Sequence, residues 1–278
     1  MLKGAKQHLH NIFKDKKKFM KNNTKSPLKD RPLRMPGQSL DEEIHNILDD
    51  EVFSYLGLPI FLIGFTIYNW LLWYQVIRLP NPILFSVAAI GISVYCFFRM
   101  IKVVKLLRSL RLGRDGERAV GQTLEALRKK GYRIFHDLVG ENFNLDHVII
   151  SEHGVFSVET KTYSKPAKGG CKINYNGDGI SINGHKPDKK IIIQVLAQKS
   201  WLERQIATIT GLKVSVKPIV VFPGWYIENH QHNKDELWVL EPKALPTYIE
   251  NSPIQITEDN VRLISNHLSR FIRTTYDK

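Results

Sequence analysis

Two long apolar runs near the N-terminus dominate the hydrophobic pattern of the chain. Residues 52–77 contain no charged side chain, and these 26 residues exceed the roughly 20 that a helix needs to cross a bilayer. A turn at 78–82 separates them from a second uncharged run at 83–98. The pattern predicts a transmembrane helical hairpin at 52–101. The alternative is a helical hairpin buried in a soluble core, although two such runs so close together are rare outside membranes.

The segments that flank the hairpin differ in charge from the turn inside it. Residues 1–34 hold eleven Lys or Arg and two acids, and we expect a mobile basic arm. No apolar region directly follows a short basic start, so this arm is not a signal peptide. An acidic segment follows up to residue 51, where Ser39 is expected to cap a short helix. Because the turn carries only Arg78, the positive-inside rule predicts a two-span protein of the cell (inner) membrane with both termini in the cytoplasm.

Basic residues with a period of three follow the second apolar run. They are Arg99, Lys102, Lys105, Arg108 and Arg111. A spacing of three drifts around a helix axis, so the cations spiral instead of forming one face. Beside a membrane, such a helix at 102–112 favours contact with anionic lipid headgroups, and contact with nucleic acid is the alternative. Gly113 is expected to end it.

From residue 113 onward, segments whose apolar residues recur with the period of a helix are followed by segments with the pattern of strands. A helix capped by Asp115 and stopped by Gly131 comes first. Strands are expected at 132–138, 145–151, 155–161, 173–175, 180–182, 214–222 and 237–240, and helices at 189–209, from 242 and at 258–276. This order predicts an α/β domain with a mixed sheet at 113–250, followed by a C-terminal helix at 251–278.

The net charge indicates the kind of partner, and the cysteine content indicates which kinds of covalent or metal site to expect. The net charge of +13 and the pI near 9.6 indicate an anionic partner, which is nucleic acid, anionic lipid or both. The two cysteines, Cys96 and Cys171, lie far apart and predict neither a disulfide framework nor a thiolate metal site. Such cysteine usage is compatible with a reducing compartment.

Charged residues gather at one end of the predicted strand pair 145–151 and 155–161. Asp146 is early in the first strand and Glu159 late in the second, so antiparallel pairing brings them together. Lys161 follows Glu159 by two positions and projects to the same face. Two carboxylates at this distance bind Mg²⁺ or Mn²⁺, which can activate water for phosphodiester hydrolysis beside a lysine that stabilises charge. From spacing alone, a surface hairpin with one salt bridge is the alternative.

Several blocks of the chain, in order, resemble one known family. The blocks are 116–120, 132–138, 146–150, 154–161, Gln194, 220–223 and 240–245. They resemble the nuclease-related domain (NERD) family of the PD-(D/E)xK, or restriction-endonuclease-like, superfamily. The resemblance covers residues 113–250 and implies a restriction-endonuclease-like mixed sheet flanked by helices. Residues 165–188 do not align with the family pattern, which leaves substrate preference open.

The resemblance also implies roles for six residues. Asp146, Glu159 and the Thr160 carbonyl would bind Mg²⁺ or Mn²⁺, and Lys161 would be the catalytic lysine. Glu117 would face the site as an additional acidic group, and Gln194 would touch the site or the substrate.

Other residues of chemical interest are assigned to packing or solvent. His147 follows Asp146, but strand alternation puts it on the opposite face, which favours a packed or exposed side chain over a metal ligand. Trp201 and Trp225 are expected in the core instead of stacked on bases. Four residues are expected in solvent: Lys189, Lys190, His230 and His232.

These features favour a membrane-tethered, metal-dependent nuclease that acts on DNA. Its expected partners are nucleic acid, DNA in the first place, and a membrane with anionic lipids, and a homo-oligomer is left open. The first alternative is a non-catalytic, membrane-anchored module that binds nucleic acid or a protein. The second is a membrane scaffold whose basic arms bind anionic lipid. The presence of Asp146, Glu159 and Lys161 together favours the nuclease.

Overall fold

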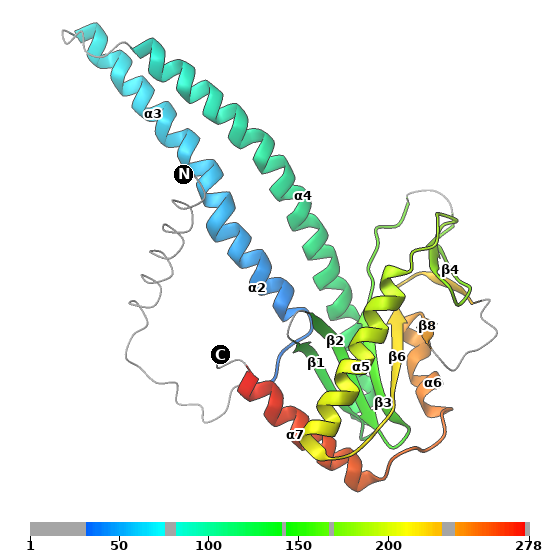
Figure 1. Cartoon of the computed structure of the whole chain (residues 1–278). Helices are drawn as coiled ribbons and strands as arrows, with labels where there is room; N and C mark the ends of the chain where they lie inside the picture. The colour runs from blue at the N-terminus through cyan, green and yellow to red at the C-terminus, as the bar shows by residue number, and fades with distance from the viewer. Residues whose placement is uncertain (1–31, 76–81, 141–142, 167–169, 230–236, 276–278) are drawn as a thin grey trace. The chain divides into compact units, whose positions relative to one another are not determined.

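The computed structural model describes residues 32–75, 82–140, 143–166, 170–229 and 237–275 (Figure 1). All but the last three residues of the expected basic arm at 1–34 lie outside this part of the chain. Most of the expected turn at 78–82 and both His230 and His232 also lie outside it.

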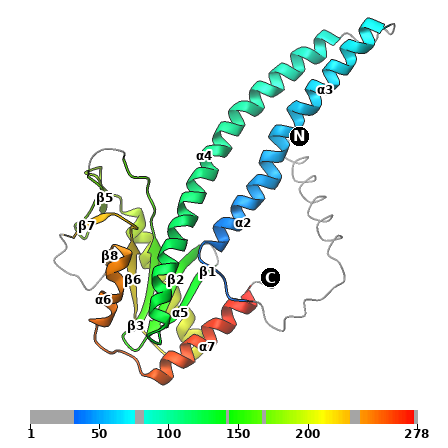
Figure 2. The ribbon, with the colours of Figure 1, turned by 180° about the vertical axis from the view of Figure 1, so that it is seen from behind.

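Two long helical segments form the hairpin. The first consists of α2 (Gln38–Ile47), the π-helical turn η1 (Leu48–Val52) and α3 (Phe53–Gln75), and the second is α4 (Pro82–Arg128). Both views of the ribbon place α3 and α4 side by side (Figures 1 and 2). The indole N–H of Trp70 donates a hydrogen bond of 3.0 Å to the Ser86 hydroxyl across this pair.

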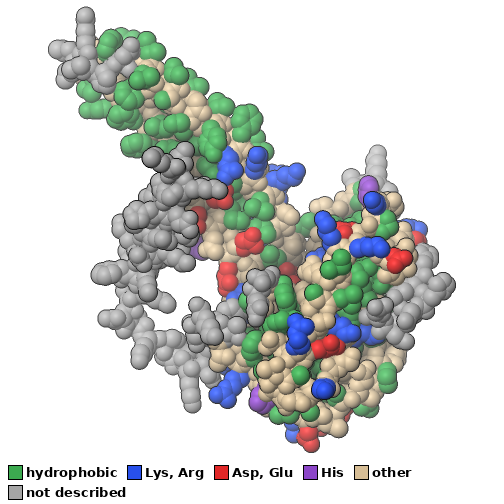
Figure 3. All heavy atoms as spheres, viewed as in Figure 1, with side chains coloured by type: hydrophobic (Ala, Val, Ile, Leu, Met, Phe, Trp, Pro, Cys, Tyr) green, Lys and Arg blue, Asp and Glu red, His purple; other side chains and the backbone are tan. Residues whose placement is uncertain are grey.

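Both segments are long and apolar enough to cross a membrane, with mean hydropathies of 1.6 and 1.9 over their most apolar stretches. Only 6% and 11% of those stretches are buried among the described residues. Phe61, Ile90 and Phe97 each expose more than 60% of their surface, and apolar side chains cover this part of the molecule (Figure 3). A helix in a soluble core would be covered on nearly all sides, so the low burial argues against that alternative.

Helix α4 continues from the apolar hairpin into the α/β domain without a break. The predictions that Gly113 ends a helix and that Asp115 caps another are therefore wrong. A glycine inside a helix costs on the order of 1 kcal/mol relative to alanine, and tertiary packing can outweigh that. Here the glycines permit close packing: a Cβ on Gly113 would lie 3.4 Å from Leu40, and one on Gly121 would lie 2.4 Å from Pro36.

The start of α2 differs from the prediction in a related way. Ser39 does not cap this helix, because Gly37 holds the N-cap position in a left-handed conformation. The backbone N–H and hydroxyl of Ser39 instead donate to the carboxylate of Asp137, at 2.7 and 2.9 Å. The carboxylate of Asp137, on a distant strand, thus accepts a hydrogen bond from a backbone N–H in the first turn of α2, where such groups have no partner within the helix.

The main sheet has five strands in the order β1-β2-β3-β6-β8. They are β1 (Arg133–Val139), β2 (Asn144–Ser151), β3 (Gly154–Thr160), β6 (Val216–Val221) and β8 (Trp238–Leu240). The β1–β2 and β2–β3 pairs are antiparallel, whereas the β3–β6 and β6–β8 pairs are parallel. The predicted mixed sheet is confirmed.

Helices cover both faces of this sheet. On one face, α5 (Lys190–Thr210) and α7 (Glu258–Thr275) pack through Leu202 and Leu268 against Val148 of β2. On the other face, the end of α4 packs together with η2 (Pro242–Ala244) and α6 (Leu245–Glu250). The helix predicted within 251–278 therefore belongs to the same core as the sheet.

A second sheet of three strands has the order β5-β4-β7. The predicted hairpin is present as β4 (Lys172–Tyr175) and β5 (Ile180–Ile182). The third strand, β7 (Tyr226–Asn229), was not predicted, and it pairs parallel to β4. The segment 165–188, which does not align with the family pattern, thus contributes two strands of this small sheet.

Candidate active site

Two buried carboxylates lie next to each other on the central strands of the main sheet. His147 pairs with Val158 between β2 and β3, which puts Asp146 and Glu159 opposite each other one step further along the ladder. Asp146 is 9% exposed and Glu159 4% exposed. The backbone N–H of Thr160 donates a hydrogen bond of 2.6 Å to Oδ2 of Asp146. The local antiparallel pairing therefore assembles the acidic pair, as expected from the sequence.

Lys161 and Gln194 join the acidic pair. Nζ of Lys161 lies 2.6 Å from Oε1 of Glu159 and 3.1 Å from Oε1 of Gln194. Nε2 of Gln194, which is in the first half of α5, donates to the same oxygen of Glu159 at 2.7 Å. The structure thus brings together four of the residues that the sequence singled out.

Gln198 is part of this network and was missed in the sequence. Its Nε2 donates to Oε2 of Glu159 at 2.7 Å and to the backbone carbonyl of Asn144 at 3.0 Å. Its side chain is buried, and both oxygens of Glu159 therefore accept hydrogen bonds from α5. The available signal was its spacing, because residues four apart on a helix share a face, and Gln198 follows Gln194 by four.

Comparison with known proteins assigns this part of the chain. A protein-family model described as nuclease-related domain matches residues 112–223. An uncharacterized protein of Bacillus anthracis is 39% identical over 171 residues, which span 57% of this chain and 76% of that protein. Residues 112–223 of the chain are a nuclease-related domain. The matched residues include all five of Glu117, Asp146, Glu159, Lys161 and Gln194. No solved structure shows significant similarity to the chain.

Two carboxyl groups of the nuclease-related domain, those of Glu117 and Asp146, have strongly raised pKa values. Burial, the charge of Asp137 and then the charge of Glu159 raise the pKa of Glu117 to about 8. Burial, followed by the charges of Glu159 and Glu117, raises the pKa of Asp146 well above its usual range. Acidic groups with raised pKa values are typical of sites that bind a cation or transfer protons.

Lys161 supplies the positive charge nearest to these carboxyl groups. Burial lowers its pKa, but the charge of Glu159 and their hydrogen bond outweigh burial, so the pKa of Lys161 is raised overall. The lysine therefore stays protonated at neutral pH. One ammonium beside two buried carboxylates leaves the centre with excess negative charge when both carboxylates are ionised.

The donor set of the nuclease-related domain fits a hard divalent cation. Within the described part of the chain, no group of three or more His, Cys, Asp or Glu side chains is arranged to hold a metal ion. Asp146 and Glu159 together offer two carboxylates, and Oδ1 of Asp146 accepts no hydrogen bond from a described residue. Mg²⁺ usually binds through one or two carboxylates and keeps several waters, so two carboxylates with open positions suit it. Thr160, expected to add its carbonyl, ends β3 beside this pair and is 8% exposed.

The residues that the sequence assigned to packing are in the core. His147 is fully buried, and its Nδ1 lies 2.8 Å from Nδ1 of His136, so it packs away from the carboxylate pair. Trp201 and Trp225 are 7% and 3% exposed and belong to hydrophobic clusters. These predictions are confirmed, as is the exposure of Lys189 and Lys190.

Proposed function

We propose that this protein is a membrane-tethered nuclease that uses Mg²⁺ or Mn²⁺ to hydrolyse phosphodiester bonds in DNA. One observation carries the proposal: within a nuclease-related domain, Asp146 and Glu159 form a buried carboxylate pair, and Nζ of Lys161 lies 2.6 Å from Glu159. Acidic residues and a lysine in this order are those of the PD-(D/E)xK superfamily that the sequence resembles.

Each residue of the site has a distinct role in the proposed reaction. Asp146, Glu159 and the Thr160 carbonyl would hold the metal ion. When bound, the ion would activate a water and neutralise charge on the phosphate oxygens. Lys161 donates from Nζ and stabilises negative charge that develops on the phosphate. Gln194 keeps Glu159 and Lys161 in place through two hydrogen bonds.

The net charge of +13 supports a polyanionic substrate.

The proposal is tested by incubating the full chain, in detergent, with supercoiled and linear DNA and Mn²⁺ or Mg²⁺. We expect cleavage that a chelator abolishes. A folded chain that binds DNA and cuts neither form with either ion would contradict the proposal and favour a non-catalytic binding module.

The hairpin is proposed to anchor the nuclease in the cell membrane, with both termini in the cytoplasm. The support is the low burial of its apolar surface and the excess of Lys and Arg outside the two spans. In a chain with Cys96 and Cys171 replaced by serine, Asn81→Cys should react with an impermeant thiol reagent applied to intact cells. Lys278→Cys should react only after permeabilisation. Labelling of Lys278→Cys in intact cells would refute this topology.

The period-three cations on α4 are proposed to bind anionic lipid. Lys102, Lys105 and Arg108 are exposed, whereas Val103 and Leu107 between them are buried against the α2 segment. A peptide of residues 99–112 should bind anionic vesicles. At about 1 kcal/mol for each cation, replacing the three residues with Gln should weaken binding roughly 100-fold. Neutral vesicles and high salt are the controls, and equal binding of both peptides to anionic vesicles would exclude this role.

A further inference from the structure

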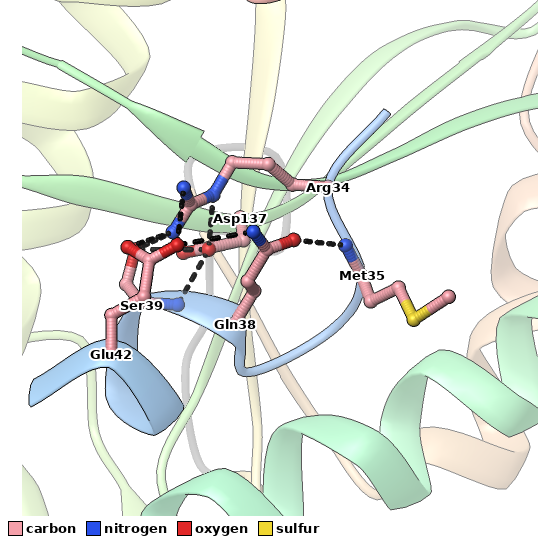
Figure 4. Close-up of polar contacts among 6 residues, drawn as sticks. All are labelled: Arg34, Met35, Gln38, Ser39, Glu42 and Asp137. Carbon is pink, nitrogen blue, oxygen red and sulfur yellow. Dashed lines mark hydrogen bonds and ion pairs between the residues drawn. The ribbon is translucent and has the colours of Figure 1, made fainter. Parts of the chain in front are cut away.

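A short segment that leads into α2 and includes its first residues packs onto the α/β domain that follows the hairpin. Residues 33–42, called here the N-terminal clasp, place Arg34 beside Asp137 of β1 (Figure 4). Nε of Arg34 donates to Oδ2 of Asp137 at 2.6 Å, and the two residues are 8% and 2% exposed. The same oxygen accepts hydrogen bonds from the backbone N–H and hydroxyl of Ser39. A buried carboxylate of the α/β domain is therefore bound by residues more than 95 positions earlier in the chain.

The other two nitrogens of the Arg34 guanidinium group bind residues within the clasp itself. Nη1 and Nη2 of Arg34 each donate at 3.1 Å to one oxygen of Glu42, and Nη2 also donates at 2.7 Å to the hydroxyl of Ser39 (Figure 4). Arg34 thus connects two acids through a planar fork of donors, a geometry that lysine does not provide.

Asp137 lies at the edge of the candidate active site. It is in β1 between the pairs His136↔His147 and Leu138↔Leu145, and is therefore level with Asp146 of β2. Its backbone is left-handed, with a φ of 50°, a conformation that few residues other than Gly, Asn and Asp adopt. The bonds from Arg34 and Ser39 support this strained position.

The clasp also affects Glu117, in the last third of α4. After burial, the charge of Asp137 is the largest influence on Glu117 and raises its pKa, whereas a hydrogen bond from the backbone N–H of Gly37 lowers it. The first influence comes from β1 and the second from the clasp. Glu117 in turn acts on Asp146 through its charge.

Close packing on α4 holds the clasp in this place. A Cβ on Gly121 would lie 2.4 Å from Cγ of Pro36, so a side chain there would displace the clasp. Asp41 pairs with Arg114 at 3.1 Å and also with Arg118. Two independent sets of contacts, one ionic at Asp137 and one steric at Gly121, therefore fix the same segment.

We infer that the N-terminal clasp positions Asp137 of β1 at the edge of the candidate active site, so that residues on both sides of the apolar spans build one catalytic unit. The catalytic part of this inference rests on the proposed nuclease function. Arg34 acts as a positioning residue, because it contacts Asp137 and not the metal-binding pair. A fragment that starts after the hairpin lacks Arg34 and leaves Asp137 buried without its ionic partner.

The test uses the full chain in detergent, below the unfolding temperature of every variant. Arg34→Met removes the ionic contact, and Gly121→Leu displaces Pro36 without changing any charge. Misplacing a catalytic constellation by about 1 Å can cost on the order of 100-fold in rate. We expect both variants to lower kcat for DNA cleavage at least ~10-fold, with the KM for DNA within about twofold, because a positioning role affects the geometry of the reaction more than substrate binding.

Matched controls separate this effect from general destabilisation. Arg262→Met removes an arginine from an exposed ion pair on α7, and Ala119→Leu enlarges an exposed residue on α4 near Gly121. Both controls should keep the wild-type kcat. Because it removes the unpaired charge as well, Arg34→Met with Asp137→Asn should recover part of the kcat lost in Arg34→Met.

Hydrogen exchange gives a second readout that does not depend on cleavage. Arg34→Met and Gly121→Leu should speed exchange of the β1 amides at 133–139 and leave the α5 amides unchanged. If β1 exchange is unchanged, the clasp does not hold β1 and the inference fails, whether or not the chain cuts DNA. If β1 loosens but an active chain keeps its kcat, the positioning role is refuted. If the wild type shows β1 protected by the clasp but cuts no DNA, only the nuclease proposal fails.

Discussion

Lys161→Ala is expected to lower the rate of DNA cleavage by about 10²–10³-fold while leaving Mn²⁺ affinity nearly unchanged. The reason is that the ammonium of Lys161 donates hydrogen bonds and cannot coordinate a metal ion. In the structure, it contacts Glu159 and Gln194, at the edge of the carboxylate pair. Single-turnover cleavage of linear DNA and calorimetric titration with Mn²⁺ measure the two quantities separately.

The carboxylates should behave differently from the lysine. Asp146→Ala and Glu159→Ala should abolish cleavage and also weaken Mn²⁺ binding, because each removes a metal ligand. Asp146→Ala combined with Lys161→Ala should be barely worse than either variant alone, because groups that act as a unit are not additive.

Two further variants are expected to reduce the cleavage rate less, and a lysine outside the site provides the control. Glu117→Gln and Gln194→Ala should reduce the rate less than Lys161→Ala, since they position other groups. Lys199→Ala is the matched control, because Lys199 pairs only loosely with Glu203, at 3.9 Å, on α5. A Lys161→Ala variant as active as the Lys199→Ala control would remove the basis for a lysine-assisted mechanism.

Without a divalent cation, the folded chain is expected to lose stability as the pH rises towards about 8, and Mn²⁺ should restore it. The pKa of Glu117 is raised from 4.5 to about 8 in the folded state. The folded state therefore binds this proton more tightly than the unfolded state does. The contribution to stability is fully present below pH 4.5, falls as the pH rises, and is lost above about pH 8.

The expected size follows from the pKa shift. One pKa unit corresponds to 1.36 kcal/mol, so we expect a loss on the order of 2–4 kcal/mol between pH 5 and pH 9. Asp146 adds to it in the same direction, since its pKa is also raised. A metal ion that binds only the folded state stabilises it by mass action, and its charge offsets that of the carboxylates.

Chemical denaturation of the full chain at pH 5, 7 and 9, with chelator or with Mn²⁺, measures this effect. Glu117→Gln should flatten the pH dependence, whereas Glu258→Gln, in an exposed ion pair, should not. Apart from Asp146, whose pKa the charge of Glu117 also raises, other titrating groups affect all three proteins alike, so the comparison isolates Glu117 together with its effect on Asp146. If wild type and Glu117→Gln lose stability in parallel as the pH rises, the raised pKa of Glu117 is wrong.

The sequence by itself determined the local features of this protein. Uncharged runs as long as a bilayer span predicted α3 and the first half of α4, because few other environments accept so much apolar surface. The strands β2 and β3 are largely apolar, are buried on both faces and are joined by a short turn. Their register follows from neighbouring residues, and this register alone brings Asp146 opposite Glu159. For the same reason, the spacing of two between Glu159 and Lys161 puts both side chains on the same face, whereas the role of Lys161 came from the resemblance to the family.

Only the tertiary structure decided the features that depend on distant contacts. Gly113 looks like a helix break in the sequence, but α4 runs through it and packs against α2 and β1. Strand β7 is short, and its partner β4 lies about fifty residues earlier, so no local pattern marks the pair.

The contact between Arg34 and Asp137 joins residues 103 positions apart. In the sequence, Arg34 was one cation of a basic arm, and Asp137 one polar residue of a strand. Their pairing depends on how the chain returns from the hairpin, because local propensity carries no information about a partner on another element. The fold therefore decided what surrounds the carboxylate pair, whereas local strand pairing decided the pair itself.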